Sequence, residues 1–344
     1  MKGCEALGEA AIRAGCLHFF GYPITPQTEV PEYLSRRLPE VGGVYLQAES
    51  EVAASNMIYG CAAAGVRVFT SSSSPGISLM SEAVSYMAGS EVPVVLINIV
   101  RGGPGLGGIL PAQSDYWQAT RGMGHGDFRI IAMAPSTVQE AADLMMDAFD
   151  LADRYRNPVM IIGDGIIGQM MEPVEFKDRP KADLPPKTWA TSGAKGRPGN
   201  KVHSLFLDPV KLENHNIKLK KKYDEVEKNE QRWELYHCDR HYDLLIVAYG
   251  TTARICKTSI DSLEQEGMRV GLVRPISLYP YPYKAVAEAS QKAKKVLVIE
   301  LSMGQMIEDV RLAIEGKVPI HFYGRSGGMV PSPEELCEQI KKII

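Results

Sequence analysis

Blocks of apolar and polar positions alternate along the first 171 residues, and they predict strands and helices in turn. Short, continuously apolar and β-branched runs are typical of strands that are buried on both faces of a parallel sheet. Such runs predict strands at 44–47, 66–70, 92–100, 129–133 and 158–162. Helical spacing predicts helices at 5–19, 27–37, 51–64, 77–88 and 137–154, with a turn at Pro23 and a polar loop at 71–76. This alternation indicates a doubly wound, mostly parallel α/β sheet.

The pattern breaks between residues 172 and 240. Prolines at positions 173, 180, 185, 186 and 198 indicate a connector. The stretch 211–234 is dense in both charge signs and predicts a solvated helix, with a partner-binding helix as the alternative. The strand–helix alternation then resumes, with strands predicted at 243–249, 269–273, 295–299 and 318–322 and helices at 251–266, 283–290, 305–314 and 333–343. The sequence therefore predicts a domain at 1–171, a connector at 172–240 and a smaller α/β domain at 241–344.

Composition limits the possible functions. The 344 residues include 38 Lys and Arg against 41 Asp and Glu, so no excess of basic charge favours nucleic acid or an anionic membrane. The apolar runs are shorter than the ~20 residues of a membrane span, and the N-terminus does not resemble a signal peptide. The six cysteines are scattered without a C-x-x-C pair, which argues against a zinc or iron–sulfur site and indicates a reducing, cytoplasmic location.

Two glycine-rich turns have the spacing of a dinucleotide-binding motif without its context. The turn at 103–108 does not open a helix, and no acidic residue ends a strand about 20 residues later, as ribose binding requires. The turn at 163–168 leads into Pro173 in place of a long helix. Its first three residues, Gly163-Asp164-Gly165, also match the start of a motif for Mg²⁺ and a diphosphate, but no asparagine follows before Asn200. A turn after a strand is the simpler interpretation.

Polar loops are predicted at the carboxyl ends of strands, where open α/β sheets bind their ligands. These loops are 21–26, 49–51, 71–76 and 100–105. Each alone has a structural explanation, since serines cap helices and glycines form loops. Together they offer hydroxyls, a carboxylate and one guanidinium, that of Arg101. A guanidinium suits a carboxylate substrate, which it can bind through two hydrogen bonds.

The same loops carry motifs that resemble the α subunit of 2-oxoacid:ferredoxin oxidoreductases. The motifs are Tyr22-Pro-Ile-Thr-Pro26, Glu49-Ser-Glu-Val-Ala-Ala54, 71–76 and Arg101-Gly-Gly-Pro-Gly105. The resemblance extends over nearly the whole chain, and its details are most similar to the branched-chain type, which acts on 2-oxoisovalerate (3-methyl-2-oxobutanoate). It implies a thiamine-diphosphate-binding fold of the pyrimidine type, followed by a domain similar to the C-terminal domain of transketolase.

The resemblance further implies an oxidative decarboxylation that needs partner chains. This chain would hold the aminopyrimidine of thiamine diphosphate, while a β subunit would hold the diphosphate and Mg²⁺ and carry an iron–sulfur cluster. Ferredoxin-like and γ subunits would complete an assembly in which this chain dimerises. Coenzyme A would take the acyl group, and ferredoxin would take the electrons. No metal ion and no iron–sulfur cluster are expected in this chain.

The resemblance also implies roles for individual residues. Glu51 matches the glutamate that contacts N1′ of the aminopyrimidine. A carboxyl at that position favours the imino tautomer, which deprotonates the thiazolium. Glu49 is the alternative candidate for this role. Thr25 and Arg101 match positions that bind the carboxylate and keto oxygen of the substrate, although Arg101 could instead form a salt bridge across a subunit interface. Further contacts are expected from Tyr22, Pro23, Ile24, Ser73 and Ser74 to the cofactor, and from Gly102 and Gly103 to the substrate.

Two alternative functions stay open at this point. A 2-oxoglutarate enzyme would need a second cation near Thr25 and Arg101, and Arg121 is the only obvious candidate. A scaffolding subunit without catalytic function would not need Thr25, Glu51 and Arg101, all of which are present.

Overall fold

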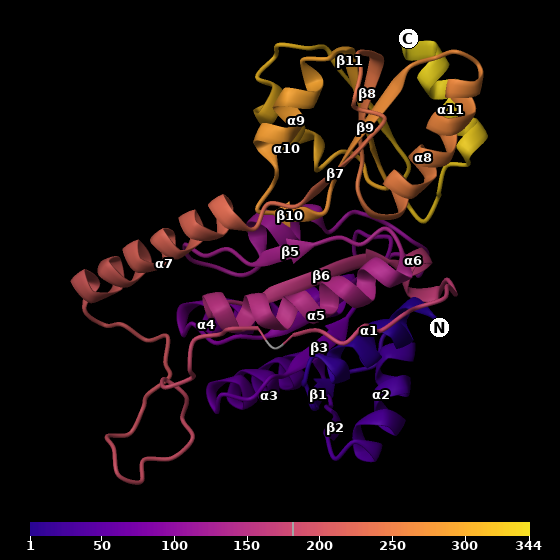
Figure 1. Ribbon diagram of the computed structural model, residues 1–344. Helices are drawn as coiled ribbons and strands as arrows, with labels where there is room; N and C mark the ends of the chain where they lie inside the picture. Colours follow the sequence, from indigo (N-terminus) through magenta and orange to yellow (C-terminus); the bar gives the residue numbers. More distant parts are fainter. Residues whose placement is uncertain (181) are drawn as a thin grey trace.

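The computed structural model describes residues 1–180 and 182–344 and contains two mainly parallel sheets, one above the other in Figure 1. The first sheet has the strand order β10-β5-β6-β4-β3-β1-β2. Its strands are β1 (His18–Gly21), β2 (Val44–Gln47), β3 (Phe69–Ser72), β4 (Val95–Val100), β5 (Ile131–Met133), β6 (Val159–Asp164) and β10 (Ser277–Tyr279). All of them pair in parallel except β10, which is antiparallel to β5. The predicted doubly wound, mostly parallel sheet is confirmed.

Helices cover both faces of this sheet. One face is covered by α1 (Gly3–Arg13), α2 (Glu29–Glu40) and α5 (Val138–Tyr155), and the other by α3 (Glu51–Ala63) and α4 (Ser74–Gly89). Two shorter segments complete this part, α6 (Gly165–Gln169) and the π-helical turn η1 (Gln118–Gly122).

Strand β4 shows why a continuously apolar run is needed at the centre of the sheet. All six of its residues are buried. Val95, Ile97 and Ile99 pack beneath α1 and α5. Leu96 and Val100, which point to the opposite face, pack beneath α3 and α4. Each face of the strand therefore removes apolar surface from water, which is the main stabilising contribution to such a core.

The second sheet has the strand order β12-β11-β8-β9-β7, with only β7 antiparallel. Its strands are β7 (Trp233–Tyr236), β8 (Tyr242–Val247), β9 (Val270–Pro275), β11 (Ala293–Glu300) and β12 (Ile320–Gly324). Its helices are α8 (Gly250–Gln265), α9 (Tyr283–Ser290), α10 (Ile307–Ile314) and α11 (Pro333–Ile343). This is the second, smaller α/β unit that the sequence predicts, although its β10 joins the first sheet.

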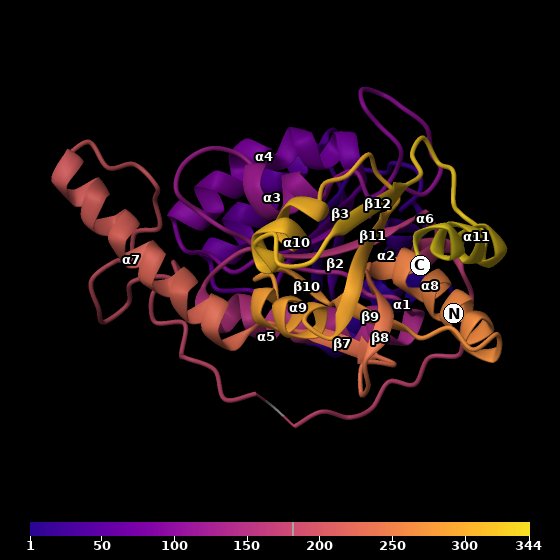
Figure 2. The same ribbon diagram turned by 90° about the horizontal axis from the view of Figure 1, so that it is seen from above.

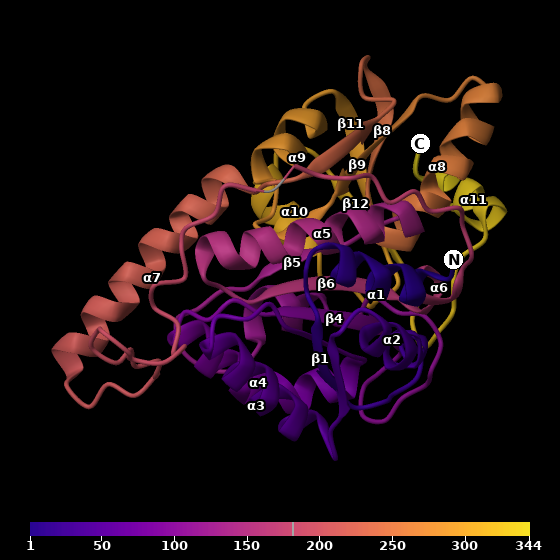
Figure 3. The same cartoon turned by 60° about the horizontal axis from the view of Figure 1, so that its bottom comes forward.

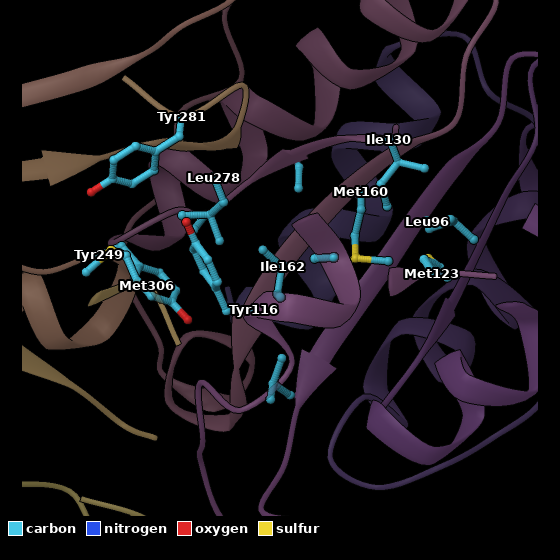
Figure 4. Packing of buried hydrophobic residues seen from close by; sticks show 14 of the residues in the cluster. Leu96, Tyr116, Met123, Ile130, Met160, Ile162, Tyr249, Leu278, Tyr281 and Met306 are labelled. Atoms are coloured by element: carbon cyan, nitrogen blue, oxygen red, sulfur yellow. The ribbon is translucent and has the colours of Figure 1, made fainter. Parts of the chain in front are cut away.

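The buried side chains of the two units meet in one continuous cluster. Figure 4 shows Met160 and Ile162 from the first sheet on one side, and Tyr249 and Met306 from the second unit on the other, with Tyr116 between them. Hydrogen bonds also cross this boundary, since Tyr116 donates to Asp309 Oδ2 at 2.6 Å. The carboxyl ends of strands in both sheets are therefore held in a fixed relation.

The first helix is shorter than the predicted 5–19, and a strand follows it. Helix α1 ends at Arg13 because Gly15 adopts a φ of 77°, a left-handed conformation that terminates helices. The residues His18–Gly21 form β1, which pairs with β2 and β3. The centroid of the Phe19 ring lies 5.7 Å from that of the Tyr45 ring and 5.0 Å from that of the Phe69 ring. Pairing with distant strands therefore overrides the local helical pattern.

The polar loop predicted at 71–76 is also mostly regular structure. Strand β3 covers Phe69–Ser72 in place of the predicted 66–70, and α4 already begins at Ser74. Pairing with β4 explains the difference, because Ser71 and Ser72 lie fully buried opposite Ile97 and Asn98 although their side chains are polar. The short strands β7 and β10 were not predicted at all.

The connector ends in a long helix that extends away from both sheets. Helix α7 (Pro209–Asn229) begins after Asp208, whose carboxylate accepts hydrogen bonds from the first turn. Its buried residues are Leu219, Tyr223 and Val226, and the rest of its surface is largely exposed. Figures 2 and 3 both show its N-terminal half projecting from the body of the molecule. The predicted solvated helix is confirmed, but it ends at Asn229, and the predicted positions 233–234 instead begin β7, which pairs with β9 of the second sheet. Among the described residues, no helix is long and apolar enough to cross a membrane.

Lys222 anchors this helix to the first unit. Its ammonium group donates to the carbonyl of Arg156 at 3.3 Å and lies 3.6 Å from Glu91 Oε1. Lys218 binds the other carboxylate oxygen of Glu91. Burial lowers the pKa of Lys222 to about 8, even though Glu91 opposes the change. The folded chain therefore holds this proton less tightly than the unfolded chain does.

The contribution of Lys222 to the free energy of unfolding therefore increases with pH. Between pH 8 and about 10.5 the unfolded chain keeps the proton of Lys222 while the folded chain loses it, so the contribution of Lys222 to the unfolding free energy increases across this range. The decrease in the pKa of Lys222 from 10.5 to about 8 corresponds to at most roughly 3–4 kcal/mol of unfolding free energy. We expect urea titrations to show that the difference in unfolding free energy between the wild type and Lys222→Met shifts in favour of the wild type as the pH rises from 8 to about 10.5. Equal pH dependence in both proteins would contradict the assignment.

Candidate functional site

The four polar loops converge at one edge of the first sheet. Strands β2, β1, β3 and β4 are neighbours and parallel, so their carboxyl ends lie side by side. The loop 21–26 follows β1, residues 48–51 follow β2, Ser73 follows β3, and Arg101 follows β4. This edge is where open α/β sheets place their ligands.

Glu51 is the buried carboxylate of this edge. It is the first residue of α3, where Ser50 caps the helix by accepting a hydrogen bond from the amide of Ala53 at 3.1 Å. Its side chain is 6 % exposed, whereas Glu49, two residues earlier, is exposed. Glu51 is therefore the carboxyl that lies inside this edge, and Glu49 lies on the surface.

Gly76 leaves the space in which the Glu51 carboxylate lies. A Cβ atom added at Gly76 would overlap Ser72 Oγ and lie 2.5 Å from Glu51 Oε1. Within the described residues, the hydroxyls of Ser72 and Ser73 are buried without a hydrogen-bond partner, as is that of Thr70. Buried hydroxyls normally find partners, so this unsatisfied cluster marks the edge as a candidate binding site.

This close approach predicts a sensitive position. We expect Gly76→Ala to displace the Glu51 carboxylate at a cost of about 1–3 kcal/mol, the usual range for overpacking. On the role that the sequence resemblance implies for Glu51, activity in the presence of partner chains should then require more thiamine diphosphate. Gly60→Ala is the matched control, because Gly60 lies in α3 with open space around it and should tolerate the extra methyl group. Identical cofactor titrations for the two variants would contradict this prediction.

Arg101 is the buried guanidinium of the edge and is 7 % exposed. Its Nη1 donates to the carbonyl of Thr25 at 2.9 Å, and its Nη2 donates to the carbonyl of Leu106 at 3.2 Å. Its Nε has no partner within the described part of the chain. These bonds fix the guanidinium between two site loops without neutralising its charge, so it can attract an anion.

The other predicted site residues surround these two groups. Thr25 is exposed, and its carbonyl fixes Arg101. Ser74 Oγ accepts a hydrogen bond from the amide of Arg101 at 3.1 Å. Gly102 is buried and Gly103 is exposed. Tyr22, at 36 % exposure, opens to the surface, while Pro23 and Ile24 are half-buried.

Several polar residues that were not predicted from the sequence form hydrogen bonds with the residues of this edge. Asn98, fully buried within β4, accepts from the amide of Ser74 at 3.2 Å and donates to Asp115 Oδ2 at 2.9 Å. Burial raises the pKa of Asp115. Gln27 accepts a hydrogen bond from Ser71 Oγ at 2.6 Å. An amide in the middle of an apolar strand, as at Asn98, is a signal that could have been recognised.

The turn after β6 has a structural role. Asp164 caps α6 by accepting hydrogen bonds from the amides of Ile166 at 2.8 Å and Ile167 at 3.2 Å. Its carboxyl is buried, and this burial raises its pKa. These contacts agree with the interpretation of Gly163-Asp164-Gly165 as a turn.

Comparison with known proteins identifies the family of this chain. Residues 9–236 match the family described as pyruvate flavodoxin/ferredoxin oxidoreductase, thiamine diphosphate-binding, and residues 243–336 match pyruvate:ferredoxin oxidoreductase core domain II. The ketoisovalerate oxidoreductase subunit VorB of Methanothermobacter marburgensis is 44% identical, covering 100% of this chain and 97% of the relative. The 2-oxoglutarate synthase subunit KorA of Methanothermobacter thermautotrophicus is 34% identical, covering 100% and 98% respectively.

Solved structures agree with these matches. The 2-oxoglutarate:ferredoxin oxidoreductase from Magnetococcus marinus superposes with a TM-score of 0.86 at 27% identity, covering 99% of this chain. This chain spans 64% of the length of that one. A split-gene transketolase superposes with a TM-score of 0.61 at 14% identity, which shows a shared fold alone. The chain therefore belongs to the thiamine diphosphate-dependent 2-oxoacid:ferredoxin oxidoreductase family, as an oxidoreductase subunit that acts together with partner chains.

Proposed function

We propose that this chain is the α subunit of a branched-chain 2-oxoacid:ferredoxin oxidoreductase, which converts 2-oxoisovalerate to its acyl-CoA and transfers the electrons to ferredoxin. The observation that carries the choice of substrate is the state of Arg121. Its guanidinium binds Glu308 at 3.0 Å and Asp309 at 2.7 Å, so it is not free for a second carboxylate. The higher identity to the ketoisovalerate relative, 44% against 34% for the 2-oxoglutarate relative, supports the same choice.

The residues at the edge fit the aminopyrimidine half of thiamine diphosphate. Glu51 supplies a buried carboxyl for the N1′ nitrogen, and the unsatisfied hydroxyls of Ser72 and Ser73 make the buried wall of this edge polar. Tyr22, Pro23 and Ile24 offer an apolar surface beside them, and Ser74 lies at the start of α4. When bound, thiamine diphosphate supplies a carbon nucleophile and an electron sink for decarboxylation.

The side chains of this subunit then have three tasks. Glu51 holds a proton at N1′ and so controls the basicity of the aminopyrimidine. Arg101 attracts the carboxylate of the 2-oxoacid through its guanidinium charge, and Thr25 places its hydroxyl beside the keto oxygen. Gly102 and Gly103, without side chains, let the substrate approach the backbone next to Arg101.

Partner chains complete the proposed site. A β subunit holds the diphosphate and Mg²⁺ and carries an iron–sulfur cluster, and ferredoxin-like and γ subunits pass electrons to ferredoxin. Two facts support this division: the relatives are named as subunits, and the six cysteines of this chain are free and scattered along it. Free, partly buried thiols also support a reducing, cytoplasmic location. Coenzyme A accepts the acyl group, and this chain dimerises within the assembly.

The test is reconstitution of the complete complex. The chain would be combined anaerobically with its β, γ and ferredoxin-like partners, thiamine diphosphate, Mg²⁺ and coenzyme A. Reduction of a dye would then be followed with 2-oxoisovalerate, 2-oxoglutarate and pyruvate. We expect the highest kcat/KM with 2-oxoisovalerate. Preference for 2-oxoglutarate would contradict the substrate, and no turnover of any 2-oxoacid would contradict the catalytic function.

A further inference from the structure

Residues 111–113 connect the carboxyl edges of the two sheets. Pro111 forms an isolated antiparallel bridge with Arg101, at the end of β4. Two residues later, Gln113 lies against Tyr249 and Leu301, which follow β8 and β11. Two residues of chain span at most about 7 Å. The position of Arg101 is therefore tied closely to the second unit.

Gln113 makes this connection with every polar atom that it has. Its Nε2 donates to the carbonyl of Tyr249 at 2.9 Å, and its Oε1 accepts from Thr252 Oγ1 at 2.8 Å and from the amide of Leu301 at 2.9 Å. Its amide donates to the carbonyl of Leu301 at 2.8 Å, and its carbonyl accepts from Tyr249 Oη at 3.2 Å. The side chain is 3 % exposed. Satisfied buried polar networks of this kind fix a single local conformation.

The loop between Arg101 and Gln113 is held at a second point. The amide of Gly102 donates to the carbonyl of Leu110 at 3.1 Å, which closes the loop 102–110 at its base. Leu110 packs directly on Gly328, where an added Cβ would collide with it. Gly328 lies beyond β12, so the ends of three neighbouring strands in the second sheet contact this loop or its continuation.

We propose that Gln113 is a positioning residue for substrate binding: it aligns the loop 102–110 and the Arg101 guanidinium with the second unit. The inference rests on the proposed role of Arg101 in binding the substrate carboxylate. Gln113 touches no reacting atom in this arrangement. It acts through Pro111 and Arg101, and the second unit thereby sets the geometry of a site that the first sheet carries.

A matched control distinguishes positioning of the substrate loop from a general loss of contacts between the two units. Gln305 also joins the same segment to the second unit, since it donates to the carbonyl of Ser114 at 2.7 Å and accepts from the amide of Trp117 at 2.9 Å. Its contacts lie after Gln113, on the side away from Arg101. The variants Gln113→Leu and Gln305→Leu both break contacts between the units, but only the first releases the substrate loop.

The experiment compares these two variants in the assembled complex. Two readouts are used: the KM for the 2-oxoacid, and hydrogen–deuterium exchange of the peptide 102–111. For Gln113→Leu we expect a KM that is higher by roughly ten- to hundredfold, as for small misplacements of a binding group, together with faster exchange of that peptide. For Gln305→Leu we expect a lower melting temperature with KM and exchange unchanged.

The inference is overturned if the two variants change KM equally, or if Gln113→Leu leaves both KM and the exchange of 102–111 as in the wild type. If Gln113→Leu does not accumulate as folded protein, Thr252→Val removes one of its hydrogen bonds, and the same two outcomes decide. Exchange does not depend on turnover. A complex without 2-oxoacid activity would therefore refute the proposed function, while the exchange data would still judge the role of Gln113.

Discussion

Glu51→Gln is expected to lower kcat of the assembled complex by about 10²–10⁴-fold, the range for loss of one acid–base group. The amide is the same size as the carboxyl and fits beside Gly76, so the fold and the cofactor site should persist. It cannot carry the charge that stabilises a proton on N1′, and the cofactor would stay in its inactive tautomer. The KM for the 2-oxoacid should change little, because the proposed ligand of the substrate carboxylate is Arg101. Steady-state kinetics with saturating thiamine diphosphate measures both constants.

Glu49→Gln is the matched control. Glu49 stands two residues before Glu51 and is exposed, so the same chemical change there should leave kcat at the wild-type value. If Glu49→Gln were the inactive variant and Glu51→Gln were active, the assignment of the two glutamates would be reversed.

Arg101→Met is expected to raise the KM for the 2-oxoacid and to lower kcat/KM by about 10²–10³-fold. Truncating one partner of a buried charged interaction typically costs 2–5 kcal/mol, and about 1.4 kcal/mol corresponds to a factor of ten. The variant also loses the bonds from the guanidinium to Thr25 and Leu106, which hold the site loops together. Arg101→Lys should recover only part of the loss, since an ammonium group cannot donate to both carbonyls and to a carboxylate in the same fork geometry.

Arg121→Met tests the choice of substrate at the same time. Arg121 is bound to Glu308 and Asp309, so its loss should lower stability but leave the KM for 2-oxoisovalerate unchanged. A large increase in KM for this variant would mean that Arg121 reaches the substrate. That result would favour a dicarboxylate such as 2-oxoglutarate.

The sequence predicts the sheet and the site loops because their patterns are local. The strand β4 is one continuous apolar run, and the doubly wound architecture follows from such runs alternating with helices. Glu51 and Arg101 each stand directly beside a strand or helix end, so their meeting at one sheet edge follows from the parallel order of the strands. The predicted choice of Glu51 over Glu49 also agrees with their burial, although the catalytic role itself stays a prediction.

The parts that could not be predicted depend on contacts between distant residues. The segment 16–21 has apolar residues that suit a helix as well as a strand, and only its pairing with β2 and β3 decides for β1. Gln113 lies in a loop with no periodicity, and its partners Tyr249, Thr252 and Leu301 are 136 to 188 positions away in the chain. Residues 277–279 likewise form the strand β10 only because they pair with β5 at the edge of the first sheet.

The central claim is that Glu51 of this chain activates a cofactor whose other half is held by a partner. The most direct measurement is the rate at which the hydrogen on the thiazolium C2 of bound thiamine diphosphate exchanges with deuterium oxide, in the complete complex without substrate. The account predicts fast exchange in the wild type and in Glu49→Gln, and exchange slower by about 10²–10⁴-fold in Glu51→Gln. Equal exchange rates in wild type and Glu51→Gln would contradict it.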